Sequence, residues 1–261
     1  MNILVCVRRV PDPAENEFRL NGPRTDLSRD DLVYSINEWD NYAVEEALQI
    51  TSRLGGEVTV ITAGGEDDEE ILRRQLAMGA QRAVLVSDEA FVETDARGIA
   101  MALAAYAKKN HFDLILTGVQ AESGGAQVGG MMAAMLDLPF ASLVTSIEAL
   151  EGNKLKVARE VAGGNKEISE MDLPCVLSIQ TGINEPRYVG MRGIRQVASV
   201  EIPSMDVGAL GIAAAELQPK VERAGYFTPV SGTGAEMLSG DRDDIVNELV
   251  ERLKARGGIP A

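Results

Sequence analysis

Aromatic residues and histidine are scarce in this chain of 261 residues, in which phenylalanine, tyrosine and tryptophan make up 4% and histidine occurs once. His111 lies in the stretch Lys-Lys-Asn-His-Phe-Asp between an expected helix and an expected strand, where we expect a solvated side chain. One histidine in this place cannot supply a Cys/His metal cluster or a Ser/His/Asp triad. We therefore assign no catalytic residue and no metal ligand.

Cysteine is also rare, and long apolar runs are missing. Cys6 and Cys175 lie within the runs ILVCV and PCVLSI, where a free cysteine behaves as a small core side chain. No run approaches the roughly 18 apolar residues that cross a bilayer, and the chain opens with a strand-like run and not with a signal peptide. We expect a cytoplasmic protein that is not integral to a membrane.

Basic residues are outnumbered, since 25 lysines and arginines face 40 acidic residues and the formal charge is −15. This charge repels a phosphate backbone at long range and favours solubility, so we do not expect nucleic acid as a partner. Hydrophobic residues make up 45% and are mainly small or branched aliphatics. Such a composition is typical of helix-covered parallel sheets.

The first half of the chain alternates short apolar runs with helical patterns. This alternation predicts βαβ units and a parallel sheet. We expect strands at residues 2–7, 57–62, 82–87 and 112–117. We expect helices from an N-cap at Asn37 to Gly55, over 68–78, over 95–108, and after the glycine-rich stretch that follows Gly118.

The second half has a different pattern. Short strand-like runs at 140–147, 154–160, 166–171 and 175–181 predict a partly antiparallel extension of the sheet. After Pro203 the chain is rich in glycine and alanine, and residues 241–254 form an amphipathic helical pattern. We expect a domain over 1–203 and an arm over 204–261, whose helix packs either on its own domain or on a partner subunit.

The stretch from Gly118 to Gly130 follows an expected strand and opens a helix. Glycine allows close backbone approach, and free N–H groups at a helix start attract an anion such as phosphate. The spacing fits neither a Walker A loop nor G-x-G-x-x-G, and a simple tight turn is the alternative. The edge of the sheet at the carboxyl ends of its strands also carries residues 6–9, 37–40 and 63–65, which follow or face strand ends. Together with the loop after Gly118, these segments could enclose a nucleotide.

The stretch Asn184 to Ile194 is the second unusual feature. It places Tyr188, Met191 and the arginines 187, 192 and 195 in an otherwise acidic chain. Tyrosine, methionine and arginine are enriched at protein interfaces. The segment is either a docking surface or an ordinary loop between a strand and a helix.

The chain as a whole resembles the beta subunits of electron transfer flavoproteins. The matching stretches follow the family's order over most of the length: ILVCVRRVPD, NEWDNYAVEEAL, LAMGAQRAVLV, DLILTGVQA with AQVGG, VARE with a Gly-Gly turn, LPCVLSI, and above all NEPRY followed by GI. Common members have Asn-Pro where this chain has Asn37-Glu38, and Ala-Ile-Asp where it has Ala-Glu-Ser. Asp40 and residues 126–129 are more similar to the flavin-bifurcating members than to the AMP-binding ones.

The resemblance implies a doubly wound, mostly parallel α/β fold of the Rossmann-like, adenine-nucleotide-binding type, with an arm that packs on the alpha subunit. In the family, an FAD of the alpha subunit transfers the electrons, and the beta subunit holds either AMP or a second FAD. The positions that match the family's nucleotide contacts are Cys6, Asn37, Glu38, Trp39, Asp40, Ala63, Ser123, Gly124, Gly125, Ala126, Gln127, Val128, Gly129, Gly130, Met131, Met132 and Ala133.

The resemblance also implies partner contacts and a role as an electron carrier rather than a stand-alone enzyme. Glu160 matches an acid that contacts an arginine of the flavin domain, and Met191 stands where the family has an anchoring leucine. Acyl-CoA or other flavin dehydrogenases would be the electron-transfer partners. The positions that resemble the dehydrogenase-docking loop are Asn184, Glu185, Pro186, Arg187, Tyr188, Met191, Arg192 and Ile194.

Two other classes of protein share part of this pattern. A stand-alone nucleotide-binding regulator of the universal-stress-protein kind has a similar α/β core and a glycine-rich loop, but it needs neither the NEPRY segment nor a long arm. A small ATP-dependent enzyme would need a phosphate-binding motif with a lysine, and none is recognisable.

Overall fold

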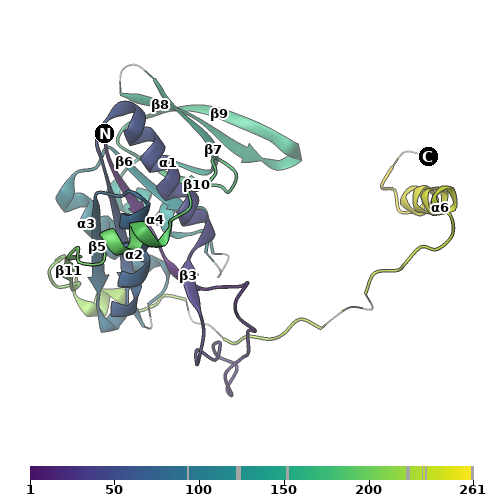
Figure 1. Cartoon of the computed structure of the whole chain (residues 1–261), viewed down its shortest axis with the longest axis horizontal. Helices are drawn as coiled ribbons and strands as arrows, with labels where there is room; N and C mark the ends of the chain where they lie inside the picture. The colour runs from purple at the N-terminus through teal and green to yellow at the C-terminus, as the bar shows by residue number, and fades with distance from the viewer. Residues whose placement is uncertain are drawn as a thin grey trace. The chain divides into compact units, whose positions relative to one another are not determined.

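The computed structural model describes residues 1–92, 94–121, 125–150, 153–221, 224–230, 232 and 234–259 (Figure 1). The contacts divide the chain into two compact units, Met1–Arg19 with Ser28–Arg223, and Leu20–Leu27 with Ala224–Ala261. The first unit therefore extends about twenty residues past the expected boundary at 203. That the arm packs on a partner subunit stays a prediction.

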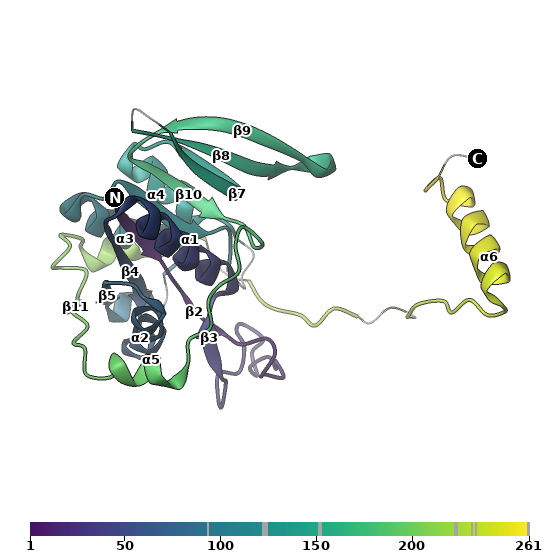
Figure 2. The same cartoon turned by 45° about the horizontal axis from the view of Figure 1, so that its top comes forward.

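The first unit is built on a nine-stranded sheet with the strand order β11-β5-β4-β1-β6-β10-β7-β8-β9. The strands from β11 to β7 pair in parallel, and β8 and β9 add antiparallel pairs that extend from the sheet as a long ribbon (Figure 2). The strands are β1 Asn2–Cys6, β4 Glu57–Gly64, β5 Arg82–Ser87, β6 Leu114–Gly118, β7 Phe140–Leu150, β8 Lys154–Val161, β9 Asn165–Asp172, β10 Cys175–Ile179 and β11 Ser204–Met205. The predicted α/β class and its antiparallel extension are thus confirmed.

Helices cover both faces of the sheet, as in a doubly wound fold. Alternate residues of β1 point to opposite faces: Ile3 and Val5 join one apolar core with helices α1 and α2, whereas Leu4 and Cys6 join another with α3 and α4. Both cores are formed mainly by aliphatic side chains, as the composition predicted. The helices are α1 Glu38–Leu54, α2 Glu69–Met78, α3 Ala96–Asn110, α4 Val128–Leu136 and α5 Met191–Gln196.

The helix starts differ in detail from the expectations. Asp95 caps α3, because its side chain accepts hydrogen bonds from the N–H groups of Arg97 and Gly98. Asn37 is the N-cap residue of α1, but its side chain makes no capping hydrogen bond. A 3₁₀ turn at Glu66–Asp68 precedes α2, so the α-helix begins at Glu69.

Several short elements were not expected, strand β11 among them. β2 (Arg9–Pro11) and β3 (Tyr34–Ile36) form a two-stranded antiparallel sheet, and α5 lies in the stretch that the sequence suggested was a loop. The guanidinium of Arg9 lies 4.0 Å from the centre of the Tyr34 ring and so ties the two strands together.

The segment after Pro203 belongs to the first unit, in which it packs against the α3 side of the sheet as far as Leu217. Its buried side chains Val207, Leu210, Ile212 and Leu217 join the core with α3. The hydroxyl of Thr94 donates to the carbonyl oxygen of Leu217 at 2.7 Å. Irregular spacing of these apolar residues explains why the sequence pattern is weak there.

The described residues of the second unit form one helix and one short hairpin. Leu20 and Leu27 form an antiparallel bridge, and the N–H of Tyr226 donates to the carbonyl oxygen of Arg24 at 2.8 Å. Helix α6 (Arg242–Ala255) is capped by Asp241. None of its described residues is buried, and Val246, Leu249 and Leu253 are 40–51% exposed, so its own unit does not cover the apolar face of α6.

Candidate functional site

Asp40 occupies the carboxyl edge of the sheet, where β1 and β6 end and α1 begins. Its side chain is buried, and its two oxygens accept hydrogen bonds from the N–H of Arg8 at 2.8 Å and the N–H of Gly118 at 2.9 Å. A Cβ on Gly118 would lie 2.6 Å from Cβ of Trp39, so only glycine lets α1 approach β6 this closely. The predicted meeting of 6–9, 37–40 and the loop after Gly118 at one edge is therefore present.

The carboxyl group of Asp40 titrates near neutral pH. Burial raises the pKa of its carboxyl group to about 7, although hydrogen bonds from Asn37, Gly118 and Arg8 act in the opposite direction. Cys6 lies nearby, and burial together with the Asp40 carboxylate raises the pKa of its thiol far above the usual range. The thiol is therefore neutral, as a structural cysteine requires.

Asn37 and Trp39 connect α1 to the loops after β6 and β10. The Asn37 amide donates to the carbonyl oxygen of Gln120 at 2.8 Å, and the Trp39 indole N–H donates to the side-chain oxygen of Gln180 at 3.0 Å. The Gln180 amide nitrogen lies 3.4 Å from a carboxylate oxygen of Glu160. Gln180 was missed from the sequence, although its place directly after a strand of the parallel region is a usable signal.

The glycine-rich loop places its residues in two different environments. Gly125, Ala126 and Gln127 are exposed just before α4, so their backbone is open to a ligand. Gly129, Met132 and Ala133 are buried, and the last two contribute to the core. Val128, Gly130 and Met131 are half-buried, and the predicted contacts Ser123 and Gly124 lie outside the described residues.

Gly129 allows α4 to pack closely on the sheet. A Cβ at this position would lie 2.7 Å from the hydroxyl oxygen of Thr117, which is hydrogen-bonded to the hydroxyl of Ser178 at 2.8 Å. In contrast, a Cβ at Gly125 would lie 3.7 Å from the nearest atom, which belongs to Gln127. Among the described glycines of this loop, Gly125 is the one whose surroundings leave room for a ligand.

Two other predicted nucleotide contacts also lie at this edge. Ala63 is half-buried near the end of β4, the neighbour of β1 in the sheet. Glu38 is exposed in the first turn of α1. Together with Cys6 and residues 37–40, these positions surround the ends of β1, β4 and β6.

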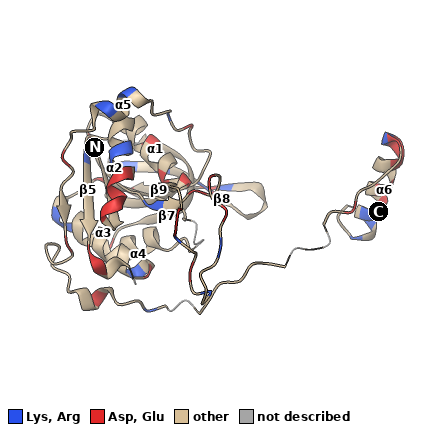
Figure 3. Ribbon diagram, turned by 60° about the horizontal axis from the view of Figure 1, so that its bottom comes forward, with Lys and Arg blue, Asp and Glu red and all other residues tan. Residues whose placement is uncertain are grey.

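The segment 184–200 forms an exposed surface around α5. Tyr188 is 90% exposed, Met191 65% and Ile194 37%. Arg192 and Arg195 add positive charge, visible as the blue part of α5 in Figure 3. Apolar side chains between arginines are typical of protein interfaces.

The first part of this segment is anchored on α1 by two buried glutamates. Arg187 donates to both carboxylate oxygens of Glu45, with N–O distances of 2.7 and 3.0 Å, and the Asn184 amide donates to Glu46 at 3.0 Å. Burial opposes the ionisation of Glu45, but the hydrogen bonds from Arg187 and Gln49, together with the charge of Arg187, outweigh it and lower the pKa of that carboxyl. Burial raises the pKa of Glu46. The guanidinium of Arg187 is thus engaged within the chain, whereas Tyr188 and Met191 are accessible.

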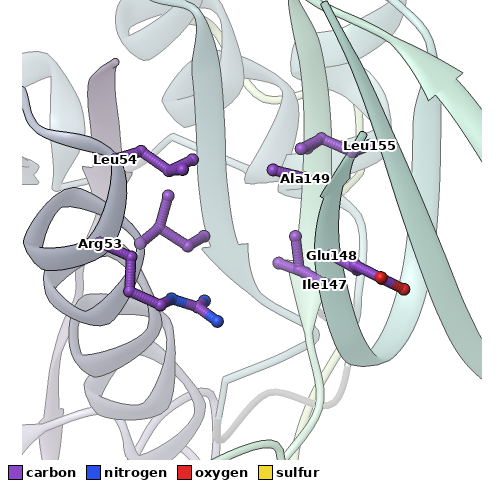
Figure 4. A pocket seen from close by; sticks show the side chains of 7 residues that line it. Arg53, Leu54, Ile147, Glu148, Ala149 and Leu155 are labelled. Carbon is purple, nitrogen blue, oxygen red and sulfur yellow. The ribbon is translucent and has the colours of Figure 1, made fainter. Parts of the chain in front are cut away.

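A cavity of about 240 Å³ lies between α1 and the β7–β8 hairpin (Figure 4). Its lining is mainly apolar: Ile50, Arg53, Leu54, Ile147, Glu148, Ala149 and Leu155. It adjoins the C-terminal end of α1, roughly 20 Å along the helix from Trp39 at 1.5 Å per residue. It contains none of the predicted nucleotide contacts.

Two further properties concern only the part of the chain that the structure describes. None of its helices has the length and apolar character needed to cross a bilayer. It contains no cluster of three or more histidine, cysteine, aspartate or glutamate side chains that could hold a metal ion.

A doubly wound sheet, whose carboxyl edge is lined by helix starts and loops, defines a Rossmann-like α/β protein. The family model described as "Electron transfer flavoprotein domain" matches residues 26–210. This chain belongs to the electron transfer flavoprotein family.

The similarity to known members extends over almost the whole chain. It is 32% identical to the electron transfer flavoprotein subunit beta of Bacillus subtilis, over 99% of this chain and 100% of the relative. It is 34% identical to the Homo sapiens subunit beta, over 99% of each chain. It is 36% identical to the caffeyl-CoA reductase-Etf complex subunit CarD of Acetobacterium woodii, over 98% of this chain and 99% of the relative.

Proposed function

We propose that this chain is the beta subunit of a heterodimeric electron transfer flavoprotein. An alpha subunit would hold the FAD that transfers electrons, and the complex would shuttle them between flavin dehydrogenases, such as acyl-CoA dehydrogenases, and a redox acceptor. The observation that supports this most strongly is the similarity to beta subunits over nearly the full length of both chains. A cytoplasmic location forms part of the proposal.

An adenine nucleotide, either AMP or a second FAD, would bind at the carboxyl edge. The exposed backbone of Gly125 to Gln127 before α4 fits a phosphate, because helix N-termini offer unpaired N–H groups. The carboxylate of Asp40 already accepts from the N–H groups of Arg8 and Gly118. A phosphate would therefore bind to the N–H groups at the start of α4 rather than to those at the ends of β1 and β6.

Two surfaces would serve protein partners. The segment 184–200 would dock a dehydrogenase through Tyr188, Met191 and Ile194, whose exposure supports this role. The apolar face of α6, which its own unit does not cover, would pack on the alpha subunit. Glu160, exposed at the end of β8, would contact the flavin domain.

Co-expression with the adjacent reading frame tests the proposal. We expect a yellow complex of two chains with either two FAD molecules, or one FAD and one AMP, after extraction and quantification of the bound nucleotides. The two results distinguish a bifurcating type of beta subunit from the AMP-binding type. A colourless monomer that binds a nucleotide alone would instead support a stress-protein-like regulator.

A further inference from the structure

Arg73 of α2 binds the backbone that directly follows α5. Its terminal nitrogen Nη1 donates to three carbonyl oxygens, of Val197 at 2.7 Å, Ala198 at 3.1 Å and Val200 at 3.0 Å. Its other terminal nitrogen pairs with Glu69, one turn earlier on α2. The guanidinium is therefore fixed between its own helix and the residues that directly follow α5.

The position of this cation has a clear physical effect. Val197 is the C-cap residue of α5, so the guanidinium lies next to the last carbonyl groups of the helix, where a positive charge balances the helix dipole. Helix α5 has only six residues and is too short to be stable in isolation. Its geometry consequently depends on tertiary contacts such as those of Arg73.

Other contacts restrain the same segment. A Cβ on Gly193 would lie 3.4 Å from the carbonyl oxygen of Ala77, so α5 packs closely on α2. Asn184 and Arg187 bind Glu46 and Glu45 on α1. The segment 184–200 is thus fastened at its start by α1 and at its end by α2, with Tyr188 and Met191 exposed between the two attachments.

We infer that Arg73 is a positioning residue for partner docking, an inference that rests on the docking role proposed for segment 184–200. By fixing α5, it keeps Met191 and Ile194 in one arrangement before a partner arrives. A surface that is already ordered loses less conformational entropy on binding, so it binds more tightly. Arg73 itself does not need to touch the partner.

Hydrogen exchange of the two-subunit complex tests the local effect. In Arg73→Met, we expect the amides of residues 194–200, among them the hydrogen-bonded N–H groups of Ile194 and Ala198, to exchange about tenfold faster. The rest of the chain should keep its wild-type rates. Arg73→Lys keeps the charge but not the planar fork, and should show an intermediate effect.

Steady-state reduction of the complex tests docking, with an acyl-CoA dehydrogenase of the same organism and its acyl-CoA substrate as the probe. We expect Arg73→Met to raise the half-saturating concentration of complex three- to tenfold at an unchanged maximal rate. Arg74→Met is the matched control, because Arg74 is exposed on the same helix and contacts no described residue through a hydrogen bond or ion pair. Met191→Ala tests the docking surface directly.

The outcomes separate the inference from the proposed function. Unchanged exchange of residues 194–200 in Arg73→Met, with a raised half-saturation in Met191→Ala, would overturn the positioning role and leave the docking role in place. Faster exchange in Arg73→Met, together with a wild-type half-saturating concentration in both Arg73→Met and Met191→Ala, would overturn the docking role. If Arg73→Met does not assemble, Arg73→Lys is measured by the same two methods and judged by the same outcomes.

Discussion

The carboxyl group of Asp40 joins the end of β1 to the end of β6 through its two hydrogen bonds, and its protonation affects stability. Its folded-state pKa is about 7, well above the unfolded value near 4, so the folded chain binds this proton more tightly. The free energy of unfolding should therefore fall as the pH rises from about 4 to about 7. A shift of this size corresponds to at most about 4 kcal/mol.

The test compares urea unfolding of the wild type and Asp40→Asn at pH 5 and pH 8. We expect the wild type to lose stability at pH 8, and the variant to lose less, by about 1 to 4 kcal/mol. Glu46 and Asp68, whose pKa values are also raised mainly by burial, contribute to the slope in both proteins, so the difference isolates Asp40. Equal slopes would contradict the assignment.

Gly125 and Gly129 should respond differently to substitution, because their surroundings differ. Gly125→Val has room for its side chain and should lose bound nucleotide at nearly wild-type thermal stability. Gly129→Val would drive a side chain into the hydroxyls of Thr117 and Ser178 and should destabilise the fold by about 3 kcal/mol. Nucleotide release by denaturation, followed by chromatography, and thermal melting measure the two effects. Wild-type nucleotide content in Gly125→Val would mean that the ligand lies elsewhere.

The sequence predicts the carboxyl edge better than the individual contacts within it. Asp40, in the first turn of α1, meets the ends of β1 and β6 as expected, because strand ends and helix starts follow from periodicity. Met132 and Ala133 were grouped with the loop, yet they face the core because a helix exposes only one side. Gln180 contacts Trp39 through a side chain 141 residues away, and no local pattern contains that information.

Helix α1 serves two sites, with Asp40 in its first turn and Glu45 and Glu46 further along. Arg187→Met would leave Glu45 buried without its partner and should cost about 1 to 3 kcal/mol, less than for a fully buried pair because Arg187 is half exposed. Denaturant unfolding measures the loss. The pKa of Glu45 is lowered in the folded state, so its contribution is present above the unfolded pKa and lost as the pH falls through the folded value.

The control for this substitution is Arg192→Met, which changes an exposed arginine of the same segment. We expect it to keep wild-type stability. The double variant Glu45→Gln with Arg187→Met should recover part of the loss, because no unpaired charge is then buried. A single Arg187→Met variant as stable as Arg192→Met would show that the ion pair does not anchor the segment.

The longer elements follow from sequence patterns, whereas the shortest ones do not. α1, α3 and β5 begin or end within two residues of the expected positions, because their apolar spacing extends over several turns or pleats. β2, β3 and α5 have three to six residues each, too few for a period to be recognised. Contacts with distant residues, such as Arg73 with Val197, determine them instead.

The first unit of the molecule should remain folded without the second. The first contains both apolar cores, and residues 207–217 are already packed on α3, so removal of residues 224–261 should leave its stability within about 1 kcal/mol. The same truncation should abolish co-purification with an alpha subunit. Circular dichroism melts and a pull-down with tagged alpha subunit measure the two results. A truncated chain that unfolds would contradict the expected stability, and one that still binds the alpha subunit would contradict the expected loss of co-purification.

Trp39 is the only tryptophan among the 261 residues, and its indole lies at the carboxyl edge, hydrogen-bonded to Gln180. The ultraviolet emission of the isolated chain, excited near 295 nm, therefore originates from this single edge. A ligand that enters there, or a change in the hydrogen bond to Gln180, would shift or quench the whole signal, without any dye or engineered label. The chain thus contains its own fluorescent reporter for the carboxyl edge of the sheet.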